Sequence, residues 1–157
     1  MTAPLKRSAA RLAAVQALYQ MELTGEDADS VTEEFAAFRF GREPEVTPGD
    51  PDRAFFGDIV RGVPRLQGEI DEAVTGCLAE GWRLSRVDSI LRAILRAGAY
   101  ELIARPDVPA KVVIDEYVEL AHAFFAADEP SFVNAALDGL ARRKRAAEFG
   151  APPNGEF

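Results

Sequence analysis

The chain has 157 residues, an apolar fraction of 48% and a charged fraction of 28%, which suits one globular domain. No run approaches the roughly 18 consecutive apolar residues that span a bilayer, and the N-terminus lacks the apolar core of a signal peptide. We therefore expect a cytoplasmic protein with no membrane contact, and the single cysteine, Cys77, excludes an internal disulfide.

The formal net charge of −8 is unevenly distributed along the chain. Residues 1–20 carry Lys6, Arg7 and Arg11 and no acidic residue. Residues 21–52 carry ten acidic residues against Arg39 and Arg42, so this acidic segment alone has a charge of −8. Because salt screens electrostatic interactions over about 8 Å under physiological conditions, a basic surface can persist on this acidic protein.

The opening stretch 7–20 predicts an amphipathic helix. Its apolar stripe consists of Leu12, Val15, Leu18 and Tyr19. The cations Lys6, Arg7 and Arg11 come before this stripe, so we expect them to project past the core at the exposed end of the helix.

Three further helical segments are predicted in the N-terminal half. Ser30 and Glu33 have the spacing of a capping box at the start of a short helix that carries Phe35 and Phe38. The pair Asp50-Pro51 predicts the start of another helix, which we expect to break into two between Pro64 and Gly68. The region 44–52 between these segments is predicted to be a loop.

The C-terminal half predicts three more helices. Apolar residues recur at helical spacing from Val87 to Leu102, a second helix starts near Pro109, and a third follows Asp128 with Pro130 in its first turn. The last helix is expected to bury Phe132, Val133, Ala136, Leu137 and Leu140.

Together these patterns predict an all-α bundle of about seven helices. We expect a single domain over residues 1–149 and a disordered tail over residues 150–157. Trp82 is expected to belong to the core rather than to an exposed stacking surface, because its surroundings have amphipathic spacing.

Motifs for catalysis are missing from the sequence. It has no Gly-rich phosphate loop, no dinucleotide fingerprint and no Cys/His set with zinc spacing, so we expect no enzyme activity and no cofactor. Glu119 and His122 form a Glu-x-x-His pair like that of di-metal bundles, but such sites need a second pair, and His122 is the only histidine. We expect Glu119 and His122 on the wet face of a helix, with no metal. Asp115 and Glu116 could with Glu119 hold a divalent cation, but carboxylates are also favoured in the first turns of a helix by its dipole, and we expect this second explanation to hold.

The cations near the N-terminus are a stronger functional signal. Arg7 and Arg11 are one helical turn apart and share a side, and cations at a helix N-terminus cost a few tenths of a kcal/mol each. Binding of nucleic-acid phosphates is one use for them, and a merely solvated basic face is the alternative. A second basic cluster, Arg142 to Arg145, is also explained by the helix C-terminus.

Four segments resemble the family of the bacterial transcription antitermination factor NusB, in order and in spacing. They are ARLAAVQALYQ at 10–20, ILRAGAYEL at 94–102, DVPAKVVIDEYVELA at 107–121 and FVNAALD at 132–138. The resemblance implies about seven helices in two packed sub-bundles and a non-enzymatic RNA-binding function. It also implies that the protein pairs with NusE, a protein of the small ribosomal subunit, and that this pair binds single-stranded boxA RNA. The pair then acts within the antitermination complex of RNA polymerase and promotes read-through of ribosomal RNA operons.

Candidate site residues follow from this resemblance by position. The implied RNA contacts are Lys6, Arg7, Arg11, Gln16, Tyr19, Arg96 and Phe132. The implied partner contacts are Asp128 and Asn134. Tyr19 is equally compatible with a core role, and Phe132 also fits the predicted core stripe of the last helix.

The sequence departs from the family pattern at Ser8, Ala9 and Ser131, where members often carry basic residues. Because each missing phosphate contact weakens RNA affinity, we expect a protein that depends on its partner for RNA binding. Members differ in forming monomers or homodimers, and both states stay open. The alternative function is a protein–protein scaffold that acts through the acidic 22–52 segment.

Overall fold

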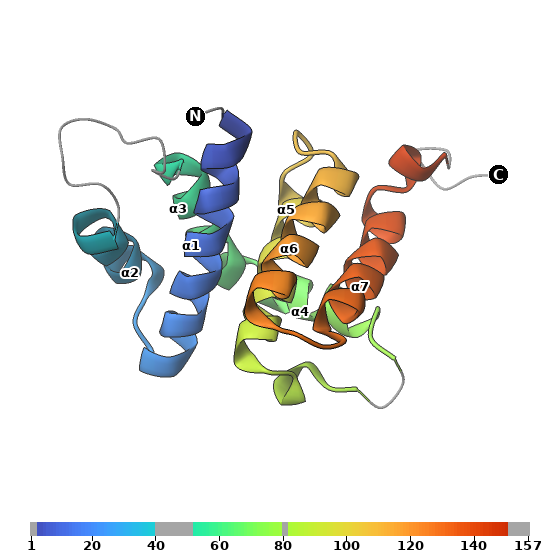
Figure 1. Cartoon of the computed structure of the whole chain (residues 1–157), viewed down its shortest axis with the longest axis horizontal. Helices are drawn as coiled ribbons and strands as arrows, with labels where there is room; N and C mark the ends of the chain where they lie inside the picture. Colours follow the sequence, from blue (N-terminus) through green and yellow to red (C-terminus); the bar gives the residue numbers. More distant parts are fainter. Residues whose placement is uncertain (1–2, 40–51, 80–81, 151–157) are drawn as a thin grey trace. The chain divides into compact units, whose positions relative to one another are not determined.

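The computed structural model describes residues 3–39, 52–79 and 82–150. Within these ranges the chain forms seven α-helices with short 3-10 and π-helical turns and no strand, which confirms the predicted all-α fold (Figure 1). The chain divides into two compact units, Met1–Arg65 (unit 1) and Leu66–Phe157 (unit 2), which correspond to the predicted pair of sub-bundles. None of the described helices is long and apolar enough to cross a membrane.

Unit 1 contains α1 (Ala3–Thr24), α2 (Ala28–Glu34), the π-helical turn η1 (Phe35–Arg39) and α3 (Arg53–Arg65). Both α1 and α2 pack against α3. The buried face of α1 is rich in alanine, with Ala10, Ala14 and Ala17 fully buried. Larger side chains from the other elements fill the core, and the rings of Phe35 and Phe56 stack with centroids 5.4 Å apart.

Two local predictions for unit 1 are wrong. Leu12, the first residue of the predicted stripe, is 36% exposed, whereas Val15 and Leu18 of that stripe are buried as predicted, beside the alanine residues. The cap of α2 is Asp27 rather than Ser30: the Asp27 carboxylate accepts a hydrogen bond from the Ser30 amide at 2.7 Å. This bond lowers the pKa of the Asp27 carboxyl. An Asp one turn earlier offers a charged acceptor where the helix dipole favours it.

The start of α3 is close to the predicted one. The helix begins at Arg53, and the carboxylate of Asp52 accepts a hydrogen bond from the Phe55 amide at 3.0 Å. The predicted start, Asp50-Pro51, lies outside the described residues, as do most of the predicted 44–52 loop, the side chain of Phe38 and the tail 151–157. The break between Pro64 and Gly68 is confirmed, because α3 ends at Arg65 and α4 begins at Gln67.

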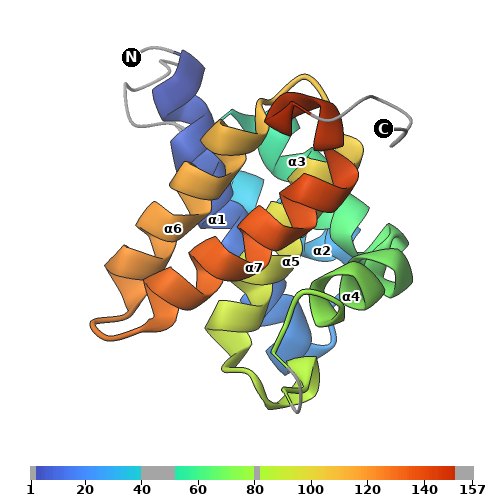
Figure 2. The ribbon, with the colours of Figure 1, turned by 90° about the vertical axis from the view of Figure 1, so that its right-hand side faces the viewer.

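Unit 2 contains α4 (Gln67–Thr75), the 3-10 turn η2 (Leu84–Arg86), α5 (Ser89–Ala104), α6 (Ala110–Phe124), α7 (Glu129–Lys144) and the 3-10 turn η3 (Ala146–Phe149). Helix α5 contacts α4, α6 and α7, so it lies at the centre of the unit (Figure 2). Gly98 permits the close packing of α5 on α7, since a Cβ there would lie 2.8 Å from a methyl group of Leu137. The predicted helix starts near Pro109 and after Asp128 are confirmed.

Arg145 ties the end of α7 to the turn between α5 and α6. Its guanidinium donates hydrogen bonds of 2.7–3.1 Å to the carbonyl oxygens of Leu102, Val108, Glu101 and Arg105. It also forms an ion pair of 2.6 Å with Glu148. Among these acceptors, Leu102 lies in the last turn of α5, where a helix leaves carbonyl groups without helical partners.

Candidate nucleic-acid interface

The basic start of α1 lies against the start of α3 in unit 1. The Asp52 amide donates a hydrogen bond of 3.0 Å to the carbonyl oxygen of Lys6. The Arg7 side chain is 36% exposed, with Nε 3.9 Å from the Asp52 carboxylate and its guanidinium carbon 4.6 Å from the centroid of the Phe55 ring. Arg7 therefore has an exposed portion that can reach a phosphate while its stem rests on an aromatic ring.

Arg11 does not project past the core, so that prediction is wrong. The residue is only 2% exposed, and its guanidinium carbon lies 4.9 Å from the centroid of the Phe55 ring. The face of α1 that turns towards α3 includes Arg11, and the aromatic ring offers the guanidinium a favourable surface. Arg7 and Arg11 thus share Phe55, but they differ in access to a ligand.

Gln16 and Tyr19 lie further along α1. Gln16 is exposed, Tyr19 is half-buried, and their spacing from the exposed Leu12 places all three on one side of the helix. This side differs from the buried alanine face. Gln16 is therefore open to a ligand or partner, and Tyr19 partly so.

Arg96 of α5 is held by Asp71 of α4. Nε and Nη2 donate to the two carboxylate oxygens at 2.8 and 2.9 Å, and the Arg96 side chain is 17% exposed. An RNA phosphate would have to compete with this bidentate ion pair. Asp71 was absent from the predicted site, because no sequence pattern links residues 25 positions apart.

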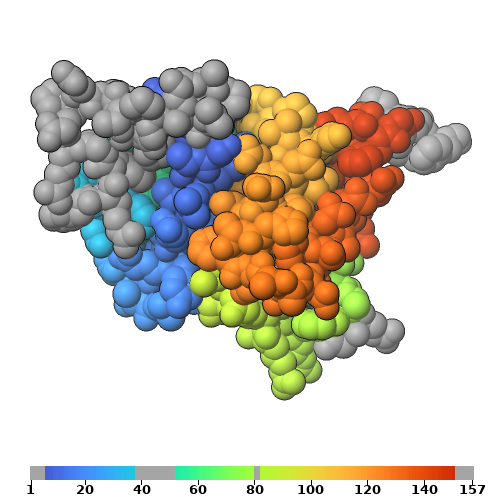
Figure 3. Space-filling model, in the orientation of Figure 1, coloured from blue at the N-terminus to red at the C-terminus, as the bar shows by residue number. Residues whose placement is uncertain are grey.

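Asp128, Phe132 and Asn134 lie in the first turns of α7. Asp128 and Asn134 are exposed, and Asn134 lines a pocket between the start of α6, the middle of α7 and the η3 turn. In Figure 3 the surfaces of these two helices lie side by side. The positions assigned to a partner are thus accessible, and they belong to the same unit as Phe132.

Two predictions of burial near this site are wrong. Trp82 is 54% exposed, and Phe132 is only half-buried. Their ring centroids lie 5.6 Å apart with an angle of 39° between the planes. The amphipathic spacing predicted both rings in the core, whereas Trp82 precedes the η2 turn and its ring lies beside that of Phe132.

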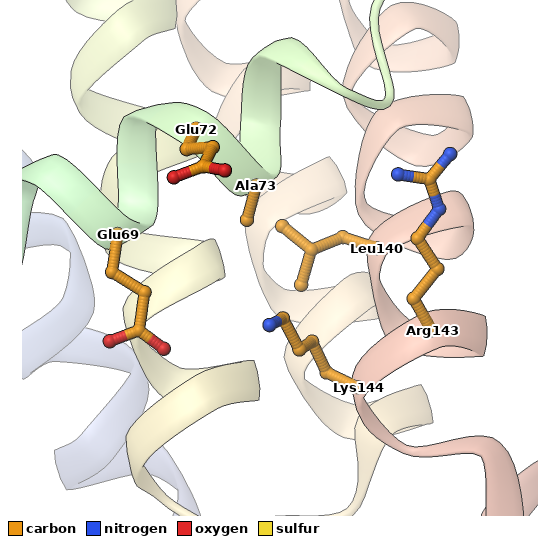
Figure 4. A pocket seen from close by; sticks show the side chains of 6 residues that line it. All are labelled: Glu69, Glu72, Ala73, Leu140, Arg143 and Lys144. Atoms are coloured by element: carbon orange, nitrogen blue, oxygen red, sulfur yellow. The ribbon is translucent and has the colours of Figure 1, made fainter. Parts of the chain in front are cut away.

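The basic cluster 142–145 is largely engaged within unit 2. Besides Arg145, Arg142 pairs with Asp138 at 2.9 Å, and Arg143 donates to the carbonyl oxygen of Gly76 at 3.1 Å. Arg143 and Lys144 also line a cavity of about 320 Å³ between α4 and α7, opposite Glu69 and Glu72 (Figure 4). The two carboxylates balance the two cations, so the cavity offers no net positive surface to a phosphate.

Glu148 completes the polar contacts of the α7 end. Its carboxylate accepts a hydrogen bond of 2.9 Å from the Ala110 amide at the start of α6, where Pro109 provides no side-chain cap. This bond and the Arg145 guanidinium lower the pKa of the Glu148 carboxyl. The predicted exposure of Glu119 and His122 on α6 is confirmed.

Comparison with known proteins identifies relatives over most of the chain. A family model described as the NusB family matches residues 8–142. The chain is 54% identical to the transcription antitermination protein NusB of Rhodopseudomonas palustris (strain TIE-1) over 145 residues, which cover 92% of this chain and 83% of the relative. It is also 54% identical to the transcription antitermination protein NusB of Caulobacter vibrioides over 140 residues, covering 88% and 94%.

Solved structures agree in fold. The T. maritima NusB structure superimposes with a TM-score of 0.76 at 29% identity, covering 92% of this chain and 96% of the other. A chain in the crystal structure of a plectonemic RNA supercoil has the same TM-score of 0.76 at 23% identity, a similarity that concerns the fold alone.

Proposed function

The chain belongs to the NusB family, and on that basis we propose that it is a transcription antitermination factor that binds boxA-type single-stranded RNA together with NusE. The observation that carries the proposal is the family match over residues 8–142 together with 54% identity to transcription antitermination proteins. The protein acts by binding rather than by catalysis. Its proposed location is the cytoplasm, where bacterial transcripts are made.

In this proposal, single-stranded RNA is held by phosphate contacts and by stacking of unpaired bases. Arg7 supports the first role, because its guanidinium is partly exposed. Gln16, Tyr19 and Phe132 supply edge and stacking contacts, with Lys6 as a further cation. Asp128 and Asn134 contact NusE.

Two candidates take indirect roles within the proposal. Arg11 supports the site by filling the space beside Phe55, since its 2% exposure leaves little surface for a phosphate. Arg96 contacts RNA only if its ion pair with Asp71 rearranges. The assembly then joins the antitermination complex of RNA polymerase, and either a monomer or a homodimer can be the resting state.

The direct test measures RNA affinity by fluorescence anisotropy, with and without NusE. We expect boxA RNA to bind more tightly than a scrambled RNA of the same composition, and NusE to increase that preference. Equal affinity for the two RNAs in the presence of NusE would contradict the proposal.

A further inference from the structure

The most exposed large aromatic side chain among the described residues is Trp82, at 54%. It lies against Phe132, so the two rings form a continuous aromatic surface in unit 2. We refer to Trp82 and Phe132 as the aromatic face. Leaving so much of an indole ring in water forgoes the hydrophobic stabilisation that its burial would bring, which favours a function for the exposed ring.

The backbone beside Trp82 is firmly held. The buried Arg92 of α5 donates from Nη1 to the carbonyl oxygens of Leu84 and Val87, at 3.1 and 2.6 Å. Leu84 and Val87 are themselves buried, and the Trp82 amide donates to the Ala79 carbonyl oxygen at 3.0 Å. The backbone that carries the indole is therefore held by hydrogen bonds, which lowers the conformational entropy that is lost when the ring binds a ligand.

Two cations lie within four residues of Trp82 in the chain. Arg83 and Arg86 are both exposed, and neither forms an ion pair within the described part of the chain. By contrast, Arg96 and Arg142 of the same unit are each paired with an aspartate. Two exposed guanidinium groups are thus close in sequence to the aromatic face, and a phosphate can bind them without displacing a carboxylate of the described residues.

We propose that the aromatic face stacks on an unpaired base of single-stranded RNA and that Arg83 and Arg86 bind the adjoining phosphates. This inference rests on the proposed function and extends it to three residues outside the family-based site. An exposed aromatic ring next to basic residues is how proteins bind single strands without base-specific hydrogen bonds. The same surface on a protein partner would leave the two arginines without matching anions unless that partner were acidic.

Trp82 is the only tryptophan in the chain, so it can be observed selectively. The chain is labelled with fluorotryptophan and mixed with unlabelled NusE and then with boxA RNA. Fluorine NMR then reports the environment of the Trp82 ring alone, while anisotropy with labelled RNA reports affinity. We expect the fluorine signal to shift on addition of RNA.

The variants separate stacking from folding. Trp82→Ala should weaken RNA binding roughly 5- to 150-fold, the range of losses on removing one base–aromatic stack, and Trp82→Phe should retain most of the affinity. Leu23→Ala on α1, which removes a side chain that is 63% exposed, is the matched control and should bind as the wild type does. Arg83→Ala and Arg86→Ala should each lower the salt dependence of binding by about 0.7 in log–log slope.

The outcomes distinguish this inference from the proposed function. If RNA binds but the fluorine signal stays in place and Trp82→Ala binds normally, the stacking role is overturned and the proposed function stands. If the signal moves on addition of NusE and Trp82→Ala weakens only that complex, the aromatic face is a protein-docking surface, which also overturns the inference. If the wild-type protein binds no RNA with NusE present, both fail together.

Discussion

At the scale of single residues, burial separates cations that look alike in the sequence. Lys6, Arg7 and Arg11 form one basic run, yet Arg11 is 2% exposed while the Arg7 side chain is 36% exposed. The number of cations and the absence of acids nearby could be read from the sequence. The burial of Arg11 on the inward face of α1 could not, because it depends on contact with Phe55 of α3.

Replacing Arg11 should therefore affect stability more than RNA binding. We expect Arg11→Ala to lower the free energy of unfolding by about 1–3 kcal/mol, because it removes a buried side chain and its contact with the Phe55 ring. Urea denaturation followed by circular dichroism measures this change. Arg7→Ala is the control, with an expected loss below about 1 kcal/mol, and equal losses for the two variants would contradict the assigned burial.

The exposure of Trp82 and Phe132 also could not be predicted from the sequence. Amphipathic spacing identifies the side of a helix that can be buried, but it does not say whether a neighbouring element covers that side. Phe132 sits in the first turn of α7, where its ring lies 5.6 Å from that of the exposed Trp82. The spacing of apolar residues therefore predicts burial least well for residues at the ends of helices.

At the scale of elements, proline and aspartate marked helix starts well. Pro109, Pro130 and the Pro64–Gly68 break fell where the helices begin or end, because their effects on backbone conformation are local. The cap of α2 was predicted at Ser30 but is Asp27, because aspartate and serine both commonly cap helices. Long-range polar pairs such as Arg96 with Asp71 depend on packing and left no local signal.

The packing of α5 on α7 can be tested at Gly98. We expect Gly98→Ala to destabilise the protein by about 1–2 kcal/mol, because the added Cβ would lie 2.8 Å from a Leu137 methyl group and 3.3 Å from the Tyr117 ring. Thermal and urea unfolding both measure the loss. Gly68→Ala in α4 is the matched control: nothing lies within 4 Å of its added Cβ, so it should stabilise by up to about 1 kcal/mol.

The link from η3 to the start of α6 should depend on pH. The pKa of the Glu148 carboxyl is lowered from its ordinary value of 4.5 by the Ala110 amide and by Arg145. Its charged form is favoured in the folded state, so this stabilisation is complete above pH 4.5 and is lost as the pH falls through the lowered pKa.

We therefore expect Glu148→Gln to be less stable than the wild type at neutral pH, and the difference to shrink in acid. Urea denaturation at several pH values measures it. Glu33→Gln on α2 serves as the control, since Glu33 is exposed and should show a small effect at every pH. A Glu148→Gln deficit that stays constant into acid would contradict the role of the charge.

At the scale of the whole molecule, net charge is a poor guide to function. The value of −8 equals that of residues 21–52, so it says little about the surfaces of α1 and α7. The all-α class followed from helical periodicity over the whole length, whereas the two sub-bundles were implied only by the family resemblance. The family followed from four separated segments, and the match over residues 8–142 confirms it.

RNA binding should accordingly weaken with salt even though the protein is acidic overall. We expect Arg7→Ala to reduce the log–log salt dependence of boxA affinity by about 0.7, the value for one phosphate contact on a single strand. Arg61→Ala on α3 removes the same charge from an exposed side chain that pairs with Asp29, and its slope should match the wild type. Equal slopes for the wild type and Arg7→Ala would remove Arg7 from the interface.

The division of the chain after Arg65 also has a consequence during synthesis. All three helices of unit 1 are available once residue 65 has left the ribosome, whereas α4 and α5 of unit 2 contact α7, which is made last. Domains generally fold as units during translation, N-terminal first, so unit 1 is expected to form while unit 2 is still being made. Arg7 and Phe55 would then meet before the segment that carries Phe132 exists, and the aromatic face would appear only after most of the chain has been made.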